Sequence, residues 1–159
     1  MAIDIQKGTH GVFFPSKLLA SMGGAHQYNI TLTANHDNGT LVKRGAWSGF
    51  DSYTEDTIAS TNDFAGVIRQ VNPDDATLFY CEATADSADL LFVYNTPKSE
   101  YAEKELQDLS LFYNKTGETV RGFSIRKGDI FMINTTLFNG TPVAGKTLTY
   151  ASGKFVVAP

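Results

Sequence analysis

The side chains that could do acid–base or metal chemistry in this sequence are three histidines and a scattered set of carboxylates. His10, His26 and His36 lie in segments rich in glycine and asparagine, and their spacing matches neither the i, i+4 pair nor the C-x-x-C pattern of zinc sites. The carboxylates between residues 51 and 63 show no spacing that singles out an acid–base pair. We therefore expect solvated loop histidines, and the sequence predicts no catalytic residue, no metal site and no cofactor.

Linear motifs of nucleotide or acyl-transfer sites are absent. Neither G-x-S-x-G, a Walker loop nor a dinucleotide fingerprint occurs. The segment 36–39, HDNG, lacks the further oxygen ligands of an EF-hand loop, which favours a hairpin turn over a calcium site. Cys81, the single cysteine, lies in the apolar run LFYCEA and is expected to be a buried, unreactive thiol.

Length and charge narrow the class of protein. A chain of 159 residues is the size of one domain with a single core. The net charge of −4 is spread without a basic stripe, so no nucleic-acid partner is expected. No segment approaches transmembrane length, and the N-terminal segment carries charges where a secretion signal would be apolar. We expect no membrane span and synthesis in the cytoplasm.

The elements that would position these side chains are mainly short strands. Residues 28–34 alternate apolar and polar side chains, and Asn38-Gly39 favours a tight turn, which predicts that residues 40–43 return antiparallel to them. A second hairpin is predicted around the turn composition of residues 72–75, and the apolar run 90–95 is typical of a central strand.

One helix is expected among the strands. Thr96 could cap it with Pro97 in the first turn, and apolar residues at helical spacing continue to Tyr113. Strand signals resume after residue 117 and continue to the end of the sequence. The predicted fold class is all-β, mainly an antiparallel barrel or sandwich, with one short helix around 97–113.

The tripeptide Lys127-Gly128-Asp129 has two interpretations. Some adhesive proteins present this tripeptide on a loop, but here it stands between two segments with strand character, 120–125 and 129–134. Gly128 sits where a bend needs a residue without a side chain. A hairpin corner is therefore favoured over an adhesive signal.

The predicted domain organisation is an N-terminal arm or extension, 1–27, followed by a single β domain, 28–159. An acidic and aromatic excursion at 46–63 interrupts the β domain. Its aromatic side chains either fold back onto the core or meet a partner. They are Trp47, Phe50 and Tyr53.

The sequence LFYNKTGETVRGFSIRKGDIFMIN, residues 111–134, resembles the head decoration proteins of tailed bacteriophages, small structural proteins on the outside of the head. The ending VAGKTLTYASGKFVVAP extends the likeness, and GTLVKRG and FAGVI are similar to the early strands of that family. These motifs are signatures of turns and strands and contain no catalytic group.

The resemblance implies a non-enzymatic virion protein that binds the outer head surface and stabilises the shell. Its partner would be the major capsid protein, and it would act as a homo-oligomer, with a trimer favoured. The N-terminal arm could order on a neighbouring subunit, although core packing of its two phenylalanines is an equal alternative. Residues proposed to contact the capsid or a partner are Ile3, Ile5, Val12, Phe13, Phe14, Trp47, Phe50 and Tyr53.

Two other functions stay open. A receptor- or carbohydrate-binding β module of a virion is the second hypothesis, because exposed aromatic rings of the excursion could stack on a sugar. A small β enzyme is the third, since catalytic groups can converge in space without a linear motif.

Overall fold

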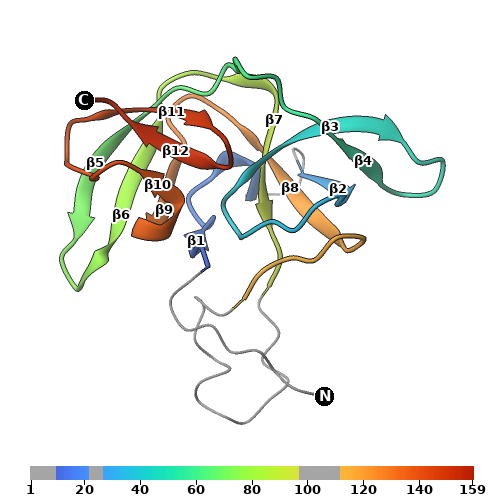
Figure 1. The fold of residues 1–159 in the computed structure, drawn as a ribbon, viewed down its shortest axis with the longest axis horizontal. Helices are drawn as coiled ribbons and strands as arrows, with labels where there is room; N and C mark the ends of the chain where they lie inside the picture. Colours follow the sequence, from blue (N-terminus) through green and yellow to red (C-terminus); the bar gives the residue numbers. More distant parts are fainter. Residues whose placement is uncertain (1–9, 22–26, 97–111) are drawn as a thin grey trace, which may run out of the picture.

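The computed structural model describes residues 10–21, 27–96 and 112–159, which form two β-sheets (Figure 1). One sheet contains β1 (Phe13–Phe14), β5 (Gly66–Asn72), β6 (Asp75–Ala83), β9 (Ile130–Asn134), β10 (Phe138–Asn139), β11 (Thr147–Ala151) and β12 (Lys154–Val157). The other contains β2 (Gln27–Thr31), β3 (Leu41–Trp47), β4 (Tyr53–Asp56), β7 (Ser87–Tyr94) and β8 (Thr119–Ile125). Short 3-10 turns occur at Leu19–Ser21 (η1) and Thr135–Leu137 (η4).

The two sheets differ in closure. The seven-stranded sheet has the order β1-β9-β6-β5-β11-β12-β10, which places the two-residue strands β1 and β10 at its edges. The other sheet closes into a five-stranded barrel in the order β2-β4-β3-β7-β8. Pairing in the barrel is antiparallel except between β2 and β4. The prediction of an all-β fold is confirmed.

Strand β7 serves two cores, which explains why its sequence is apolar on both faces. Leu91 and Val93 belong to the cluster inside the barrel, while Leu90 and Phe92 belong to the larger cluster between the barrel and the seven-stranded sheet. Alternate side chains of a strand point to opposite faces, so one strand can fill both spaces. The prediction of a central strand at 90–95 is confirmed, with β7 extending to Ser87.

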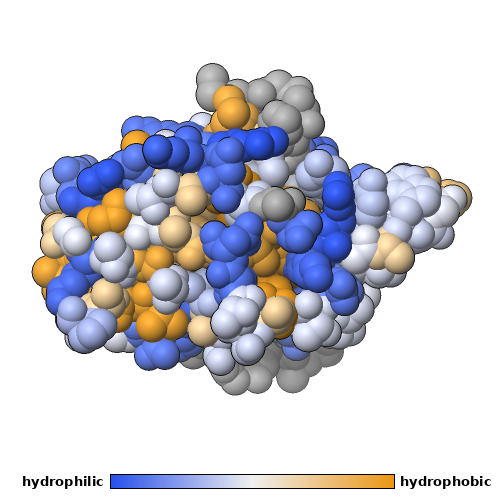
Figure 2. Space-filling model, turned by 90° about the horizontal axis from the view of Figure 1, so that it is seen from above, coloured by the Kyte–Doolittle hydropathy of each residue, from blue (hydrophilic) through white to orange (hydrophobic). Residues whose placement is uncertain are grey.

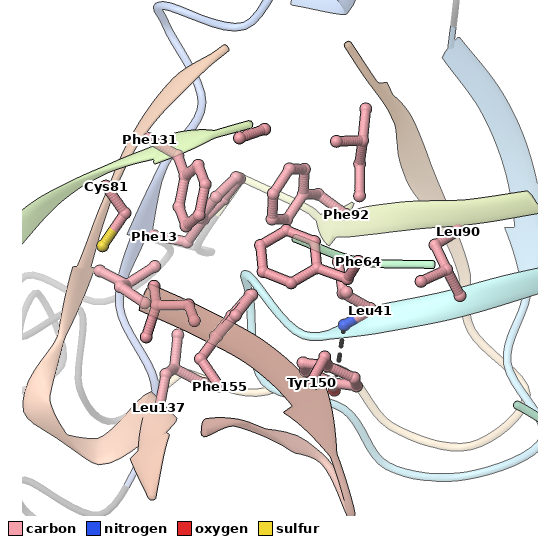
Figure 3. Close-up of a cluster of buried hydrophobic side chains, with 14 of the residues drawn as sticks. Phe13, Leu41, Phe64, Cys81, Leu90, Phe92, Phe131, Leu137, Tyr150 and Phe155 are labelled. Carbon is pink, nitrogen blue, oxygen red and sulfur yellow. Dashed lines mark hydrogen bonds between the residues drawn. The ribbon is translucent and has the colours of Figure 1, made fainter. Parts of the chain in front are cut away.

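The larger core contains packed phenylalanine rings together with aliphatic side chains such as Leu41, Leu90 and Leu137 (Figure 3). Phe92 lies 4.8 Å from Phe131 and 5.0 Å from Phe13, measured between ring centroids. At its margin the Tyr150 hydroxyl accepts a hydrogen bond of 3.1 Å from the Leu41 amide, which joins β11 to β3. Aromatic pairs at these distances add to the stabilisation that comes from burial alone.

Two turns join neighbouring strands that pair with each other, and the first of them is predicted from the sequence. β5 and β6 are antiparallel neighbours with Asn72 opposite Asp75, as the turn composition of that segment predicts. β11 and β12 are joined through Ser152 and Gly153, which both have positive φ, 52° and 80°. Positive φ at both central residues is the geometry of a type I′ turn, whose twist matches that of paired strands.

The first predicted hairpin is wrong. Gly39 does have a positive φ of 88°, but β3 pairs with β4 and β7, and β2 pairs with β4 and β8. The turn instead bonds to β7: the Gly39 amide donates to the Val93 carbonyl, and the Asn38 side chain exchanges hydrogen bonds with the Asn95 backbone. These long-range bonds outweigh the local preference for a hairpin.

The corner at Lys127-Gly128-Asp129 is a turn, but not the corner of a hairpin. Gly128 has a φ of 91°, and the Asp129 amide donates to the Arg126 carbonyl. The strand before it, β8, lies in the barrel, whereas the strand after it, β9, pairs with β1 and β6. The corner therefore carries the chain from one sheet to the other.

Most of the predicted helix at 97–113 lies outside the described residues. Phe112 and Tyr113 are in irregular backbone, and Asn114 forms an isolated antiparallel bridge with His36. Among residues 10–21, 27–96 and 112–159, no helix has the length and apolarity needed to cross a bilayer.

Candidate functional site

Strands β3 and β4 form a hairpin that projects from the barrel (Figure 1) and carries exposed aromatic side chains. The same projection is visible at the right of the space-filling view (Figure 2). Phe50 is 88% exposed and Trp47 is 53% exposed, whereas Tyr53 is half-buried. Trp47 and Tyr53 are opposite each other across the hairpin, with ring centroids 5.0 Å apart and edge to face. Both alternatives predicted for the aromatic side chains therefore occur: Tyr53 packs back onto the barrel, and Phe50 is left in solvent.

The tip of this hairpin is held by hydrogen bonds. The Ser48 amide donates to the Ser52 carbonyl at 2.8 Å, and their hydroxyls are 3.2 Å apart. The Phe50 amide donates to the Ser48 hydroxyl, and the Asn29 side chain on β2 donates to the Asp51 carbonyl. A tip fixed in this way loses little conformational entropy when its aromatic side chain is buried by a partner.

The base of the hairpin contains an arginine held between two tyrosines. The Arg44 guanidinium carbon lies 4.6 Å from the ring centroid of Tyr28 and 5.0 Å from that of Tyr53. Both tyrosines pack against the core inside the barrel. Cation–π contacts of this kind restrain the arginine. Arg44 and Tyr28 are not predictable as a pair from the sequence, because pairing of β2 with β4 is what brings them together.

The N-terminal residues from His10 onward are part of the β domain. Phe13 is 3% exposed and lies in the larger core, and Val12 and Phe14 are half-buried. The Asn134 amide donates to the Val12 carbonyl, and the Asn134 side chain donates to the His10 carbonyl. Core packing, one of the two alternatives for the phenylalanines, therefore describes Phe13.

Two residues proposed from the sequence to contact the capsid, Ile3 and Ile5, lie outside the described residues. The structure places Trp47, Phe50 and Tyr53 on the β3–β4 hairpin. It places Phe13 and Phe14 on β1, in the other sheet. The predicted site residues form two separate groups.

A histidine–carboxylate cluster that the sequence analysis missed lies beside the hairpin. His36 Nε2 is hydrogen-bonded to Glu55 Oε1, and Glu55 Oε2 accepts from the Thr33 amide at 2.8 Å and the Thr33 hydroxyl at 3.2 Å. On its other side, His36 Nδ1 is 3.4 Å from the Thr40 hydroxyl. That hydroxyl donates to the Asp37 carbonyl at 2.8 Å. Its proton is thus directed away from the histidine.

A half-open groove of about 580 Å³ runs past this cluster. Its lining includes the turn between β11 and β12, Glu55 on β4, and residues 57–60 and 62. Glu55 has both carboxylate oxygens occupied by hydrogen bonds within the chain. The cluster therefore joins a loop to a strand at the wall of the groove.

The expectation of solvated histidines is wrong for two of them. His10 Nδ1 is 2.8 Å from an Asp37 carboxylate oxygen, and the other oxygen accepts from the Gly11 amide at 2.8 Å. The His10 ring also stacks on Tyr113, with centroids 4.6 Å apart. His10 and His36 are both partly buried against carboxylates, while His26 lies outside the described residues.

The Asp129 side chain is unavailable as an adhesive signal. It is 4% exposed, and its carboxylate accepts from the Arg126 amide at 2.9 Å and from the Leu19 amide at 3.0 Å. An adhesive loop would have to present this carboxylate to a partner. The tripeptide is therefore a structural turn, although not the hairpin corner that the sequence predicted.

Two buried groups have perturbed acidity. Burial raises the pKa of the Cys81 thiol to about 12, which keeps it protonated and unreactive at neutral pH. Burial also raises the pKa of the Tyr150 hydroxyl to about 12, although the hydrogen bond from Leu41 opposes the shift. In the described part of the chain, no group of three or more histidine, cysteine or acidic side chains is placed to hold a metal ion.

A scan against protein-family models finds no match, and neither a curated protein nor a solved structure matches the chain.

Proposed function

We propose that this chain is a non-enzymatic decoration protein of a bacteriophage head, which binds the major capsid protein on the outer surface and stabilises the shell. The observation that carries the proposal is the projecting β3–β4 hairpin, with Phe50 88% exposed on a tip held by hydrogen bonds. A folded chain that leaves a fixed aromatic ring in water is suited to burying that ring against a partner.

The arrangement of polar groups supports a binding role. The histidine and carboxylate side chains brought together by the fold, in the pairs His10–Asp37 and His36–Glu55, connect loops to each other or to a strand. The Asp129 carboxylate is bonded to backbone amides in the same way. Such groups make a fold rigid, which a shell-reinforcing protein requires. The resemblance of residues 39–45, 64–68, 111–134 and 143–159 to head decoration proteins points to the same role.

Undecorated heads assembled from the capsid protein encoded with this chain provide the test. We expect the purified chain to sediment with the heads at a saturating, symmetric stoichiometry and to raise the temperature at which the heads open. Phe50→Ala and Trp47→Ala together should abolish binding while leaving the β circular dichroism spectrum unchanged. Absence of binding by the wild-type chain at every salt concentration would refute the proposal.

A carbohydrate-binding virion module is the second candidate, and the exposed ring of Trp47 favours it. A half-exposed indole beside Tyr53 is a surface on which a sugar ring can stack. A glycan array separates the two functions: binding to a defined glycan that is lost in Trp47→Ala supports the second candidate. A blank array together with head binding supports the first.

A further inference from the structure

A small pocket opens beside β1 and β9, at one edge of the seven-stranded sheet. Its volume is about 140 Å³, and its apolar and aromatic lining residues are Phe14, Tyr80, Ile130, Phe131 and Met132. Lys17 also lines it, with Nζ 5.9 Å from the centroid of the Tyr80 ring. An apolar cavity of about 150 Å³ accommodates one benzene ring. The pocket is therefore the right size for a single phenyl side chain.

The chain itself carries a side chain of that shape. Phe50 is 88% exposed, more than any other large apolar residue in the described part of the chain. Its neighbour Asp51 is exposed and negative, whereas Lys17 at the pocket is exposed and positive. The hairpin tip and the pocket thus match in both size and charge.

We propose that Phe50 of one copy inserts into this pocket of a second copy, with Asp51 placed beside Lys17 of that copy. The hairpin belongs to the barrel, whereas the strands that line the pocket, β1, β6 and β9, belong to the other sheet (Figure 1). The two surfaces therefore lie in different parts of the molecule. A contact between two different surfaces is heterologous, and it repeats head to tail until a ring closes.

The contact is small, which sets its strength. A single aromatic ring in a pocket, with one charge pair at the rim, falls at the low end of the size range of protein interfaces. The fixed geometry of the tip lowers the entropic cost of association. We therefore expect weak association in solution, with a dissociation constant of roughly 10–500 μM. Phe50 is also the ring that the proposed function buries against the capsid protein, and one ring cannot occupy both sites at once. The contact is therefore proposed for copies in solution, and it goes beyond the proposed function.

Sedimentation of the full chain over a concentration series tests the contact in the absence of heads. The mean mass should rise with concentration, and Phe50→Ala should weaken association about 30-fold, as expected for a central aromatic anchor. Val143→Ala is the matched control, because Val143 is also exposed and apolar, at 50%, and lies outside both surfaces. It should associate like the wild type.

A mixing experiment tests whether the contact is heterologous. Ser16 is exposed and lines the pocket, so Ser16→Trp should block the pocket and leave the tip intact. Phe50→Ala lacks the inserting ring and keeps the pocket. Each variant alone should be monomeric, and their mixture should give a 1:1 dimer that cannot grow further. Circular dichroism confirms that both variants are folded.

Variants that reverse the charge of Lys17 or Asp51 test the proposed ion pair at the rim of the pocket. Lys17→Glu and Asp51→Lys should each weaken association about 2- to 5-fold, and the double variant should recover most of the loss. A monomeric wild type at millimolar concentration, unchanged association of Phe50→Ala, or a mixture that stays monomeric would each overturn the contact. Head binding without self-association overturns only this contact, whereas self-association without head binding overturns only the proposed function.

Discussion

The imidazole of His36 and the carboxylate of Glu55 connect the loop before β3 to strand β4. The second oxygen of Glu55 reaches the amide and hydroxyl of Thr33, in the segment that follows β2. A single side chain on β4 therefore fixes the loop that leaves β2 and enters β3. Because β4 also supports the projecting hairpin, the same carboxylate contributes to the stability of the candidate binding surface.

Glu55→Ala should lower the free energy of unfolding by about 1–2 kcal/mol, because it leaves the partly buried His36 ring and the Thr33 amide without their acceptor. Urea unfolding followed by circular dichroism measures the change. Asp56→Ala is the control on the same strand, because Asp56 is exposed and its Oδ2 lies 3.7 Å from Lys43 Nζ. This variant should lower the free energy of unfolding by less than about 0.5 kcal/mol. Equal losses in the two variants would contradict a structural role for Glu55.

Asp129→Ala should lower the free energy of unfolding by about 2 kcal/mol, because the Arg126 and Leu19 amides lose a charged acceptor in a buried corner. Lys127→Ala, in the exposed part of the same turn, should change it by less than about 0.5 kcal/mol. Urea denaturation of both variants provides the comparison. A larger loss for Lys127→Ala would show that the turn is stabilised in another way.

The Cys81 thiol should resist a thiol reagent in the folded chain and react fully in denaturant. Its side chain is completely buried, and its raised pKa, about 12, leaves almost no thiolate at pH 8. The time course of absorbance with a chromogenic disulfide measures this. Rapid reaction of the native chain at pH 8 would contradict the packing around Cys81.

Stability should fall in alkaline solution. The pKa values of Cys81 and Tyr150 are about 12 in the folded chain, against ordinary values of 9.0 and 10.0. Above pH 9 the unfolded chain therefore releases protons that the folded chain retains, so the free energy of unfolding decreases as the pH rises from 9 towards 12. Urea unfolding at pH 8 and pH 11 tests this, and an unchanged midpoint would contradict it.

Phe92→Ala should destabilise the chain by about 3–5 kcal/mol and lower the melting temperature of both sheets together. Phe92 is fully buried between the barrel and the seven-stranded sheet, with Phe13 and Phe131 packed against it. Thermal unfolding by calorimetry and by tyrosine fluorescence should coincide. Two separate transitions would mean that the sheets are held independently.

Local sequence is sufficient to predict strands and turns where two paired strands are close along the chain. The turn between β5 and β6 and the apolar run in β7 are both predictable, because alternation and turn chemistry act over a few residues. The sequence of β7 has no polar residue between Leu90 and Val93, which indicates that both faces of the strand are buried. It does not indicate which strands pack against each face.

Predictions failed where partners distant in sequence decide the pairing. Asn38-Gly39 has the composition of a hairpin turn, but the hydrogen bonds of Asn38 with Asn95 direct the following strand to β7. The contact of Arg44 with Tyr28 and the hydrogen bond of His36 with Glu55 depend on how β2, β3 and β4 assemble. Exposure of Phe50 was one of two alternatives that composition alone leaves open.

The short strands at the two margins of the seven-stranded sheet affect how the chain behaves when it is concentrated. A long, flat sheet margin offers unpaired backbone amides and carbonyls on which another chain can add a strand, and this is a common route to fibrils. Here the barrel has no margin, and β1 and β10 are only two residues each. Many copies can therefore accumulate with little risk of backbone-mediated aggregation, and contacts between copies are left to side chains.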